Sequence, residues 1–387
     1  MCMVAGYRYK LYKTDRTKHL DAMLREACFV WNHALALQKR YHRLYGGYVR
    51  KERMQNFFSQ KRNRTKHVYN NVLLDAQTVQ EVLERQAEAY DRFFKHLAKR
   101  PPKFRKAADF KSIVFKQTGY KLYGNEVVIN KISKRYKFSF SRPYDGGKVK
   151  RIQIKRNGLG EYFLIVSLEK SGERIGKSHD GASVGIDFGL KTYMTLSNGT
   201  EIQNPRFLKA DMAELKRRSR DFSRCEKGSN NRSRRKRELA KLHDDIKNRR
   251  DAWQWELAHE LCRKYDLICV EDLELTGMSR LWGRKMADLG HAEFIRKLEH
   301  LSHKYGVTVH KIDRYWPSSR TCACGHVNEE LTLSDRVWTC PECGAVHRRD
   351  LLAAQNILRR GIAELGSTRK TGTLPARCVS TQESPGL

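Results

Sequence analysis

The spacing of hydrophobic and polar residues changes several times along the chain, and each change marks an expected element. Residues 4–13 alternate apolar and polar side chains, a pattern that predicts a β-strand. Residues 15–43 instead place apolar side chains three and four positions apart, as in an amphipathic helix. A second helical run at 72–97 stops before Pro101 and Pro102, which cannot continue a helix. The first hundred residues therefore predict one strand followed by a mostly helical region.

A period of two returns between residues 110 and 169. The segments KFSFS, KRIQIKR and EYFLIVSLE alternate, and the turn sequences DGG at 145–147 and NG at 157–158 separate them. These features predict a small antiparallel β-barrel or sandwich. Because the strand at 4–13 needs partners, we expect this β module to be interrupted by a helical insertion at about 15–105.

The second half of the chain predicts a mixed α/β sheet. Beyond a polar linker at 170–180, consecutive strands are expected in SVGIDFGL, TYMTLS and GTEIQ. Long helices should follow to about residue 265, then the apolar strand LICVEDL, a helix near 291–305, the strand VTVHKID, a cysteine-rich loop and a final helix from Asp350. The tail after about Gly366 is rich in Thr, Ser, Gly and Pro, which predicts disorder.

The net charge of the chain indicates which class of binding partner to expect. The 387 residues include 77 Lys and Arg against 43 Asp and Glu, a formal net charge of +34. Self-repulsion of this size is tolerated mainly where a polyanion neutralises it, which favours nucleic acid over a small neutral metabolite. No stretch approaches the roughly 18 to 20 consecutive apolar residues of a membrane span, and the N-terminus has no apolar signal segment. We expect a cytoplasmic protein without a membrane partner.

Basic residues are concentrated in two stretches. Residues 206–250 hold 17 Lys and Arg with 7 Asp and Glu, and residues 92–116 hold nine basic residues with one acid. A solvated helical hairpin would explain the first stretch, but in so basic a chain we favour phosphate contacts. The candidates for nucleic-acid binding there are Arg232, Arg234, Arg235, Lys236 and Arg237.

Three acids occur at the edges of expected elements in the second half. Asp187 lies in the first strand, Glu271 ends the strand ICVE, and Asp350 opens the last helix. Taken singly, they could be a turn residue, a surface charge and a helix N-cap. Taken together, they fit the need of two-metal phosphodiester hydrolysis for carboxylates that converge from different elements.

Four cysteines lie between positions 322 and 343, as CAC and CPEC. In a reducing compartment this spacing indicates a structural zinc site before it indicates disulfides. The candidate ligands are Cys322, Cys324, Cys340 and Cys343. Free buried cysteines remain the alternative. Because the first pair has a single spacer, His326 is a candidate to replace Cys322.

The motifs GIDFGLK, VEDL, PSSRTCACG, WTCPECG and HRRDLLAAQNI, in this order, resemble the transposon-encoded TnpB proteins, RNA-guided DNA nucleases related to type V CRISPR effectors. The resemblance implies an α+β multidomain chain: a RuvC-type, RNase H-like nuclease domain with a zinc-binding insertion, and an antiparallel wedge barrel interrupted by a helical recognition domain. The expected parts are the wedge (1–14 and 106–180), the recognition domain (15–105), the nuclease domain (181–316 and 348–366), the zinc insertion (317–347) and the tail (367–387).

The resemblance also implies an activity and its partners. Asp187, Glu271 and Asp350 would hold two Mg²⁺ ions and a Zn²⁺ ion would be structural. A guide RNA from the transposon end would direct cleavage of double-stranded DNA beside a short motif. Rough alignment suggests base contacts by Gln77, Gln80 and Gln117, although surface or capping glutamines are an equal alternative.

An RNA-guided DNA-binding repressor with weak or no cleavage is the alternative function, and the presence of all three acids favours the nuclease. A guide-independent transposase or resolvase would leave the β module and its helical insertion unexplained.

Overall fold

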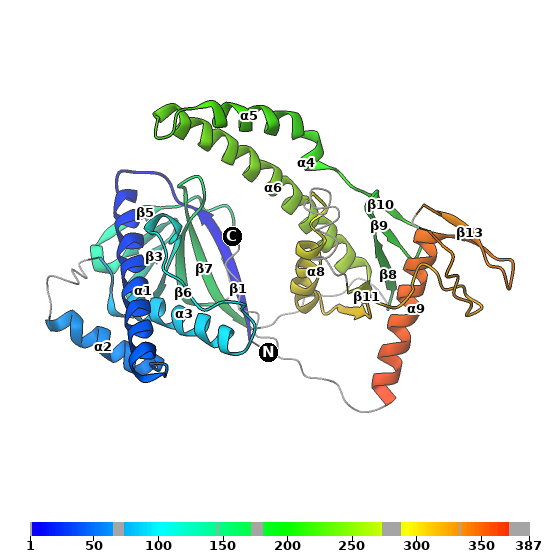
Figure 1. Cartoon of the computed structure of the whole chain (residues 1–387), viewed down its shortest axis with the longest axis horizontal. Coiled ribbons are helices and arrows are strands. Elements are labelled where there is room, and N and C mark those ends of the chain that lie inside the picture. The colour runs from blue at the N-terminus through cyan, green and yellow to red at the C-terminus, as the bar shows by residue number, and fades with distance from the viewer. Residues whose placement is uncertain are drawn as a thin grey trace. The chain divides into compact units, whose positions relative to one another are not determined.

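The computed structural model describes residues 2–64, 73–144, 147–171, 181–272, 288–332 and 334–370. The chain divides into two compact units, residues 1–172 and 173–387 (Figure 1). Most of the expected linker at 170–180 lies outside the described residues.

Over its described residues, unit 1 combines two open antiparallel sheets with three helices. Its four-stranded sheet has the order β1-β7-β6-β2 and its three-stranded sheet the order β3-β4-β5. The strands are β1 (Cys2–Lys10), β2 (Ser112–Lys116), β3 (Tyr120–Tyr123), β4 (Glu126–Ile129), β5 (Lys134–Lys137), β6 (Lys148–Arg156) and β7 (Tyr162–Ser171). The helices are α1 (Thr17–Tyr45), α2 (Lys51–Arg64) and α3 (Ala76–Phe94), with 3-10 turns at Ala107–Asp109, Gln117–Gly119 and Asn130–Ile132.

The helices lie in the chain between β1 and β2, as the sequence predicts, but the barrel does not close. Among the described residues, the two sheets are joined through the isolated bridge between Leu11 and Phe138. β1 and β2 therefore remain the edges of the four-stranded sheet. The helices close the core instead, because α1 residues such as Leu20 and Trp31 pack in one cluster with sheet residues such as Phe115 and Leu164. Sheet and helices thus share one hydrophobic core.

Unit 2 is built on a five-stranded mixed sheet with the order β10-β9-β8-β11-β12. The strands are β8 (Ser183–Phe188), β9 (Thr192–Leu196), β10 (Glu201–Gln203), β11 (Leu267–Glu271) and β12 (Thr308–Ile312). β8, β9 and β10 pair antiparallel, whereas β11 lies parallel to both β8 and β12. The predicted mixed α/β sheet is therefore present.

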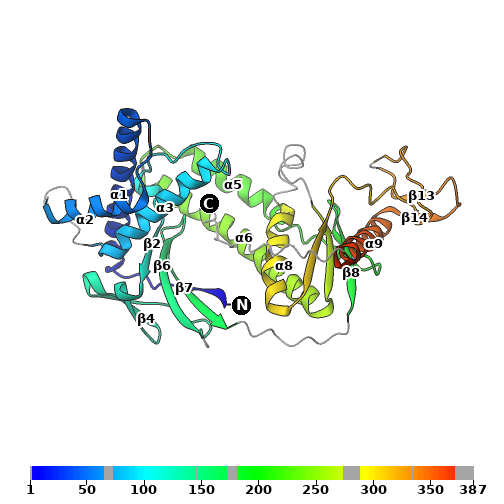
Figure 2. The same cartoon turned by 90° about the horizontal axis from the view of Figure 1, so that it is seen from below.

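Helices cover both faces of this sheet (Figures 1 and 2). α6 (Asn230–Lys264) and α8 (His291–Tyr305) pack on one face, and α9 (Arg349–Lys370) packs on the other. α4 (Phe207–Ala210) and α5 (Met212–Arg224) precede α6, and the short strands β13 (Val337–Thr339) and β14 (Val346–Arg348) precede α9. α9 continues to Lys370, past the expected end of order at Gly366, and the rest of the tail lies outside the described residues.

Alternation along β8 assigns its two faces. Val184 and Ile186 are buried in the core beneath α6 and α8, so Gly185 and Asp187 face α9. A Cβ atom on Gly185 would lie 2.1 Å from the backbone oxygen of Ala354 in α9. The backbones of β8 and α9 can approach this closely only because residue 185 has no side chain.

We expect Gly185→Ala to destabilise unit 2 by at least about 1–3 kcal/mol, because the added methyl group meets helix backbone that cannot rotate away. Gly158→Ala is the matched control, since a Cβ there meets nothing within 4 Å. Thermal unfolding by calorimetry measures both. Equal melting temperatures for the two variants would show that α9 can move off the sheet without cost.

Candidate functional site

The three candidate acids come from elements that meet at one edge of the sheet in unit 2. β8 and β11 are parallel neighbours, with Val270 paired to Ile186, so Glu271 and Asp187 follow at the same end. α9, which packs on β8, carries Asp350 in its first turn. The sheet order and the packing of α9 therefore bring together three acids that are 84 and 79 positions apart in the sequence (271 − 187 and 350 − 271).

The electrostatics of the acids show that they interact. Burial, followed by the negative charges of Asp350 and Glu271, raises the pKa of Asp187 to about 7 against the opposing effect of Arg349 and Arg336. Burial also raises the pKa of Glu271 to about 7. Carboxylates held together in a partly desolvated place repel one another, and a divalent cation would relieve that repulsion. A donor set of oxygen atoms alone is the kind that Mg²⁺ prefers.

Arg336 is a neighbour of this cluster that sequence reasoning missed. Its Nη1 donates to Asp350, 3.1 Å from Oδ1 and 3.3 Å from Oδ2. The backbone oxygen of Arg336 also accepts a hydrogen bond from the N–H of Arg349 at 2.9 Å. The segment before β13 is thereby fastened to the start of α9. No spacing in the sequence signals this contact, because it depends on how the cysteine-rich loop folds back.

The four cysteines form a compact group. Their sulfur atoms all lie within 4.8 Å of one another, with Cys322 3.5 Å from Cys343 and Cys324 3.6 Å from Cys340. Burial opposes ionisation of Cys340, but amide hydrogen bonds from Cys343 and Glu342, together with the thiols of Cys343 and Cys322, outweigh it and lower its pKa to about 6. The four sulfurs are therefore placed as the ligands of one tetrahedral metal ion would be.

The shortened first pair closes in the same way as the second. In CAC, the N–H of Cys322 donates to the oxygen of His326 (2.8 Å) and Gly325 donates to Cys322 (3.1 Å). In CPEC, Cys340 donates to Ala345 and Gly344 donates back to Cys340, both at 2.9 Å. Gly325 and Gly344 both have positive φ, +97° and +69°. The missing spacer is thus absorbed by a turn that is one residue tighter.

The structure gives the two nearby histidines different partners. Nδ1 of His326, the expected substitute for Cys322, lies 3.2 Å from Oε1 of Glu342. The suggestion that His326 takes the fourth position therefore has no support, because Cys322 itself joins the sulfur group. His347, which sequence reasoning did not consider, has Nε2 3.0 Å from Sγ of Cys322.

Asn356 is a second residue that sequence reasoning missed. It is 3 % exposed in the middle of α9, and its Nδ2 donates to the backbone oxygens of Ser318 (2.8 Å) and Thr321 (2.6 Å). These bonds fix the segment that leads into Cys322. An Asn next to the apolar residues of AAQNI, within an expected helix, was the available signal.

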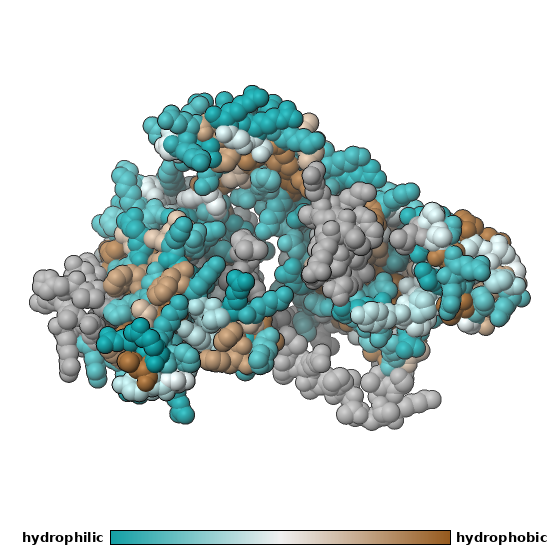
Figure 3. All heavy atoms as spheres, in the orientation of Figure 1, coloured by the Kyte–Doolittle hydropathy of each residue, from teal (hydrophilic) through white to brown (hydrophobic). Residues whose placement is uncertain are grey.

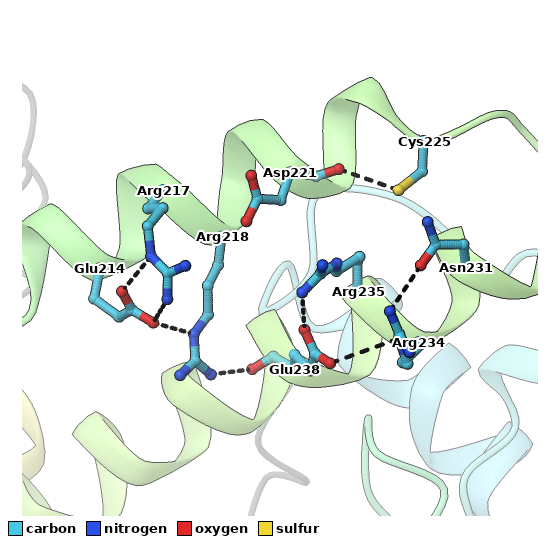
Figure 4. A network of polar contacts seen from close by, with 9 residues as sticks. All are labelled: Glu214, Arg217, Arg218, Asp221, Cys225, Asn231, Arg234, Arg235 and Glu238. Atoms are coloured by element: carbon cyan, nitrogen blue, oxygen red, sulfur yellow. Dashed lines mark hydrogen bonds and ion pairs between the residues drawn. The ribbon is translucent and has the colours of Figure 1, made fainter.

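The basic stretch at 206–250 forms a helical hairpin of α5 and α6, and the face seen in Figure 3 is mostly hydrophilic. Its arginines do not all point to solvent. Nη1 of Arg232 donates to the backbone oxygens of Phe222 (3.1 Å) and Cys225 (2.8 Å), and its guanidinium lies 4.2 Å from the ring centre of Phe222. Arg234 and Arg235 both pair with Glu238 (Figure 4).

Two of the five basic candidates are therefore better placed for nucleic acid than the others. Lys236 and Arg237 are exposed, and within the described residues neither side chain makes a hydrogen bond or an ion pair. Arg232 instead satisfies the carbonyl groups at the end of α5, which gives it a structural role. Sequence composition could not separate these residues, since all lie within one run of six.

The three candidate glutamines, all in unit 1, do not share one site. Gln77 and Gln117 line one groove of about 520 Å³, where Oε1 of Gln77 accepts from the hydroxyl of Thr118 at 2.7 Å. Gln80 is exposed and does not line it. The other lining residues are mostly polar or basic: Glu81, Lys116, Thr118, Lys150, Arg151 and Ser167.

Comparison with known proteins agrees with this arrangement. A family described as probable transposase matches residues 166–281, and a Cas12f1-like TNB domain matches residues 291–357. The chain is 30 % identical to a putative RNA-guided DNA endonuclease of Streptomyces pristinaespiralis over 92 % of this chain and 89 % of the relative. It is 28 % identical to the putative RNA-guided DNA endonuclease InsQ of Escherichia coli K12, over 88 % of each chain.

The protein in the structure of a Cas12f1–sgRNA–target DNA complex is similar in fold, with a TM-score of 0.59 at 13 % identity over 92 % of this chain and 98 % of that one. The fold is thus of the compact Cas12f type. The chain belongs to the TnpB family, and the resemblance found in its motifs is confirmed. Over the parts that the structure describes, no helix has the length and apolar character needed to cross a bilayer.

We expect Arg232→Ala to loosen the hairpin, because two backbone carbonyls lose a charged donor, a change worth roughly 1.5–3 kcal/mol for such bonds. Amide hydrogen exchange over residues 212–246 should become at least about tenfold faster by the same estimate. The double variant Lys236→Ala/Arg237→Ala removes more charge but should leave exchange unchanged. If all variants exchange at the same rate, Arg232 does not stabilise the hairpin.

Proposed function

We propose that this protein is an RNA-guided DNA endonuclease that hydrolyses phosphodiester bonds at the carboxylate cluster of unit 2. The observation that carries the proposal is the convergence of Asp187, Glu271 and Asp350 on one sheet edge, in a chain whose relatives are named for this activity. Guide pairing would select the target, while the protein holds the backbone and reads a short flanking motif.

Asp187, Glu271 and Asp350 offer oxygen donors alone, the type that Mg²⁺ prefers, and would hold two Mg²⁺ ions. When bound, the ions supply an activated water and stabilise the leaving oxygen. The chain carries these carboxylates on β8, β11 and α9, three elements that pack directly on one another. Arg336 and Arg349 place positive charge beside the acids and offset part of their repulsion.

We further propose that the four cysteines hold a structural Zn²⁺ ion. Four thiolates complete a tetrahedral site and leave no position open for chemistry. The apolar cluster around them is small: Cys322, Leu331, Trp338, Cys340 and Leu352. A cluster of this size cannot order a loop of about 30 residues, so metal binding would supply the missing folding energy.

Phosphate and base contacts are assigned to separate surfaces. Lys236 and Arg237 on the hairpin would contact phosphates, which position nucleic acid without reading sequence. Their neutralisation should lower the magnitude of the log–log salt slope of guide-RNA binding by roughly 0.7–0.9 per lost contact. The groove lined by Gln77 and Gln117 also has Lys116 and Arg151 in its lining, and amide groups together with basic side chains suit base edges and phosphates.

Asp187→Ala, Glu271→Ala and Asp350→Ala should each abolish cleavage and leave target binding within a few-fold of wild type, since binding rests on phosphate contacts and base pairing. The assay uses protein with its co-purified RNA, and the same protein freed of RNA is the control for guide dependence. EDTA should stop the reaction, and Mg²⁺ or Mn²⁺ should restore it. Wild-type protein that binds target but never cuts would favour the repressor.

Cys322→Ser should lose zinc as completely as Cys324→Ser, Cys340→Ser and Cys343→Ser, because the sulfur of Cys322 completes the group. His326→Ala should keep one equivalent. Elemental analysis of the purified variants measures this. Zinc retained in Cys322→Ser and lost in His326→Ala would reverse the assignment of the fourth ligand.

Gln77→Ala and Gln117→Ala should each weaken discrimination between the preferred flanking motif and a changed one by roughly 1–3 kcal/mol, the range for a good base contact. Gln80→Ala, on the same helix but outside the groove, is the matched control. Binding to target duplexes with each flanking base changed in turn gives the discrimination. The groove would be excluded as the reading site if all three variants kept the wild-type preference.

A further inference from the structure

His347 lies between the cysteine group and the start of α9. It is the middle residue of β14, and its Nε2 is 3.0 Å from Sγ of Cys322. The next strand residue is Arg348, after which α9 begins at Arg349 and brings Asp350. His347 therefore contacts the sulfur group only three positions before Asp350, a proposed catalytic acid.

The geometry indicates a hydrogen bond to sulfur and not a fifth ligand. The four sulfurs lie within 4.8 Å of one another and already complete a tetrahedral set, which does not include His347. A thiolate that binds a metal has no proton to donate, so the imidazole must carry the hydrogen on Nε2 and Cys322 must accept it. Four thiolates around one Zn²⁺ leave a net charge of −2, which a donated N–H partly offsets.

The ring of His347 is held in place by its cross-strand partner. Trp338 on β13 pairs with His347 in the strand register, and the two ring centres are 4.9 Å apart. Trp338 is 6 % exposed and packs in the same cluster as Cys322 and Cys340. The imidazole is therefore aimed at sulfur by packing, whereas His326 in the same loop faces the carboxylate of Glu342.

We propose that His347 donates a hydrogen bond from Nε2 to the Cys322 thiolate of a zinc site and thereby fastens β14, and the start of α9, to the metal. His347 is a positioning residue: it touches neither substrate nor the reacting atoms. The proposal rests on the zinc site proposed above. Removing such an outer partner of a metal ligand typically lowers metal affinity roughly 10- to 100-fold without removing the metal.

The test measures zinc affinity by competition with a chromophoric chelator, using the full chain. His347→Phe keeps the aromatic contact with Trp338 but has no donor, so it should bind one equivalent of zinc roughly 10- to 100-fold more weakly. His347→Gln keeps an N–H and should retain more of the affinity. His326→Phe is the matched control and should equal wild type. If His347→Phe does not fold, His347→Leu takes its place beside His347→Gln.

Co²⁺ substitution supplies a second readout. The visible absorption of the Co²⁺ form should keep the pattern of four sulfur ligands in His347→Phe. An affinity within twofold of wild type would overturn the proposal, as would loss of the zinc with a changed Co²⁺ spectrum, since His347 would then be a ligand. Wild-type protein without zinc would reject the zinc site itself, whereas cleavage results for Asp187, Glu271 and Asp350 do not depend on this outcome.

Discussion

The close contact between β8 and α9 is the constraint on which the candidate active site depends. Gly185 lets the helix backbone approach the strand until a single methyl group would not fit. Gly361, further along α9, makes a similar approach to β11, where a Cβ would lie 2.3 Å from Sγ of Cys269. Two contacts of this kind fix both the height and the direction of the helix over the sheet. The carboxylate of Asp350 thereby comes within electrostatic reach of Asp187, two residues beyond Gly185.

Sequence reasoning went furthest where a local pattern determines the answer. Strands β8 and β11 are short apolar runs, and the acids at their edges were visible without any tertiary information. The cysteine spacing likewise predicted a group of four. Each of these signals is local, because strand alternation and turn spacing are set by residues a few positions apart.

The parts that were missed depend on contacts between distant residues. The alternating pattern between residues 110 and 169 does not determine whether the sheet closes into a barrel. Closure depends on the register between strands that are far apart in the chain. The partner of His347 is 25 positions away and that of Asn356 is 38. Arg232 and Lys236 are chemically alike in the sequence and differ only in whether a carbonyl lies within reach.

The length of α6 has a mechanical consequence. Its 35 residues span about 52 Å at 1.5 Å per residue. Its first half pairs with α5 around a small cluster of Leu215, Leu242 and Ile246, while its second half is buried against the sheet. The helix ends at Lys264, and β11, which carries Glu271, begins at Leu267. One continuous helix thus connects the basic tip of the hairpin with the residues that precede Glu271, so a force applied at the tip would be transmitted along α6 to the start of that strand.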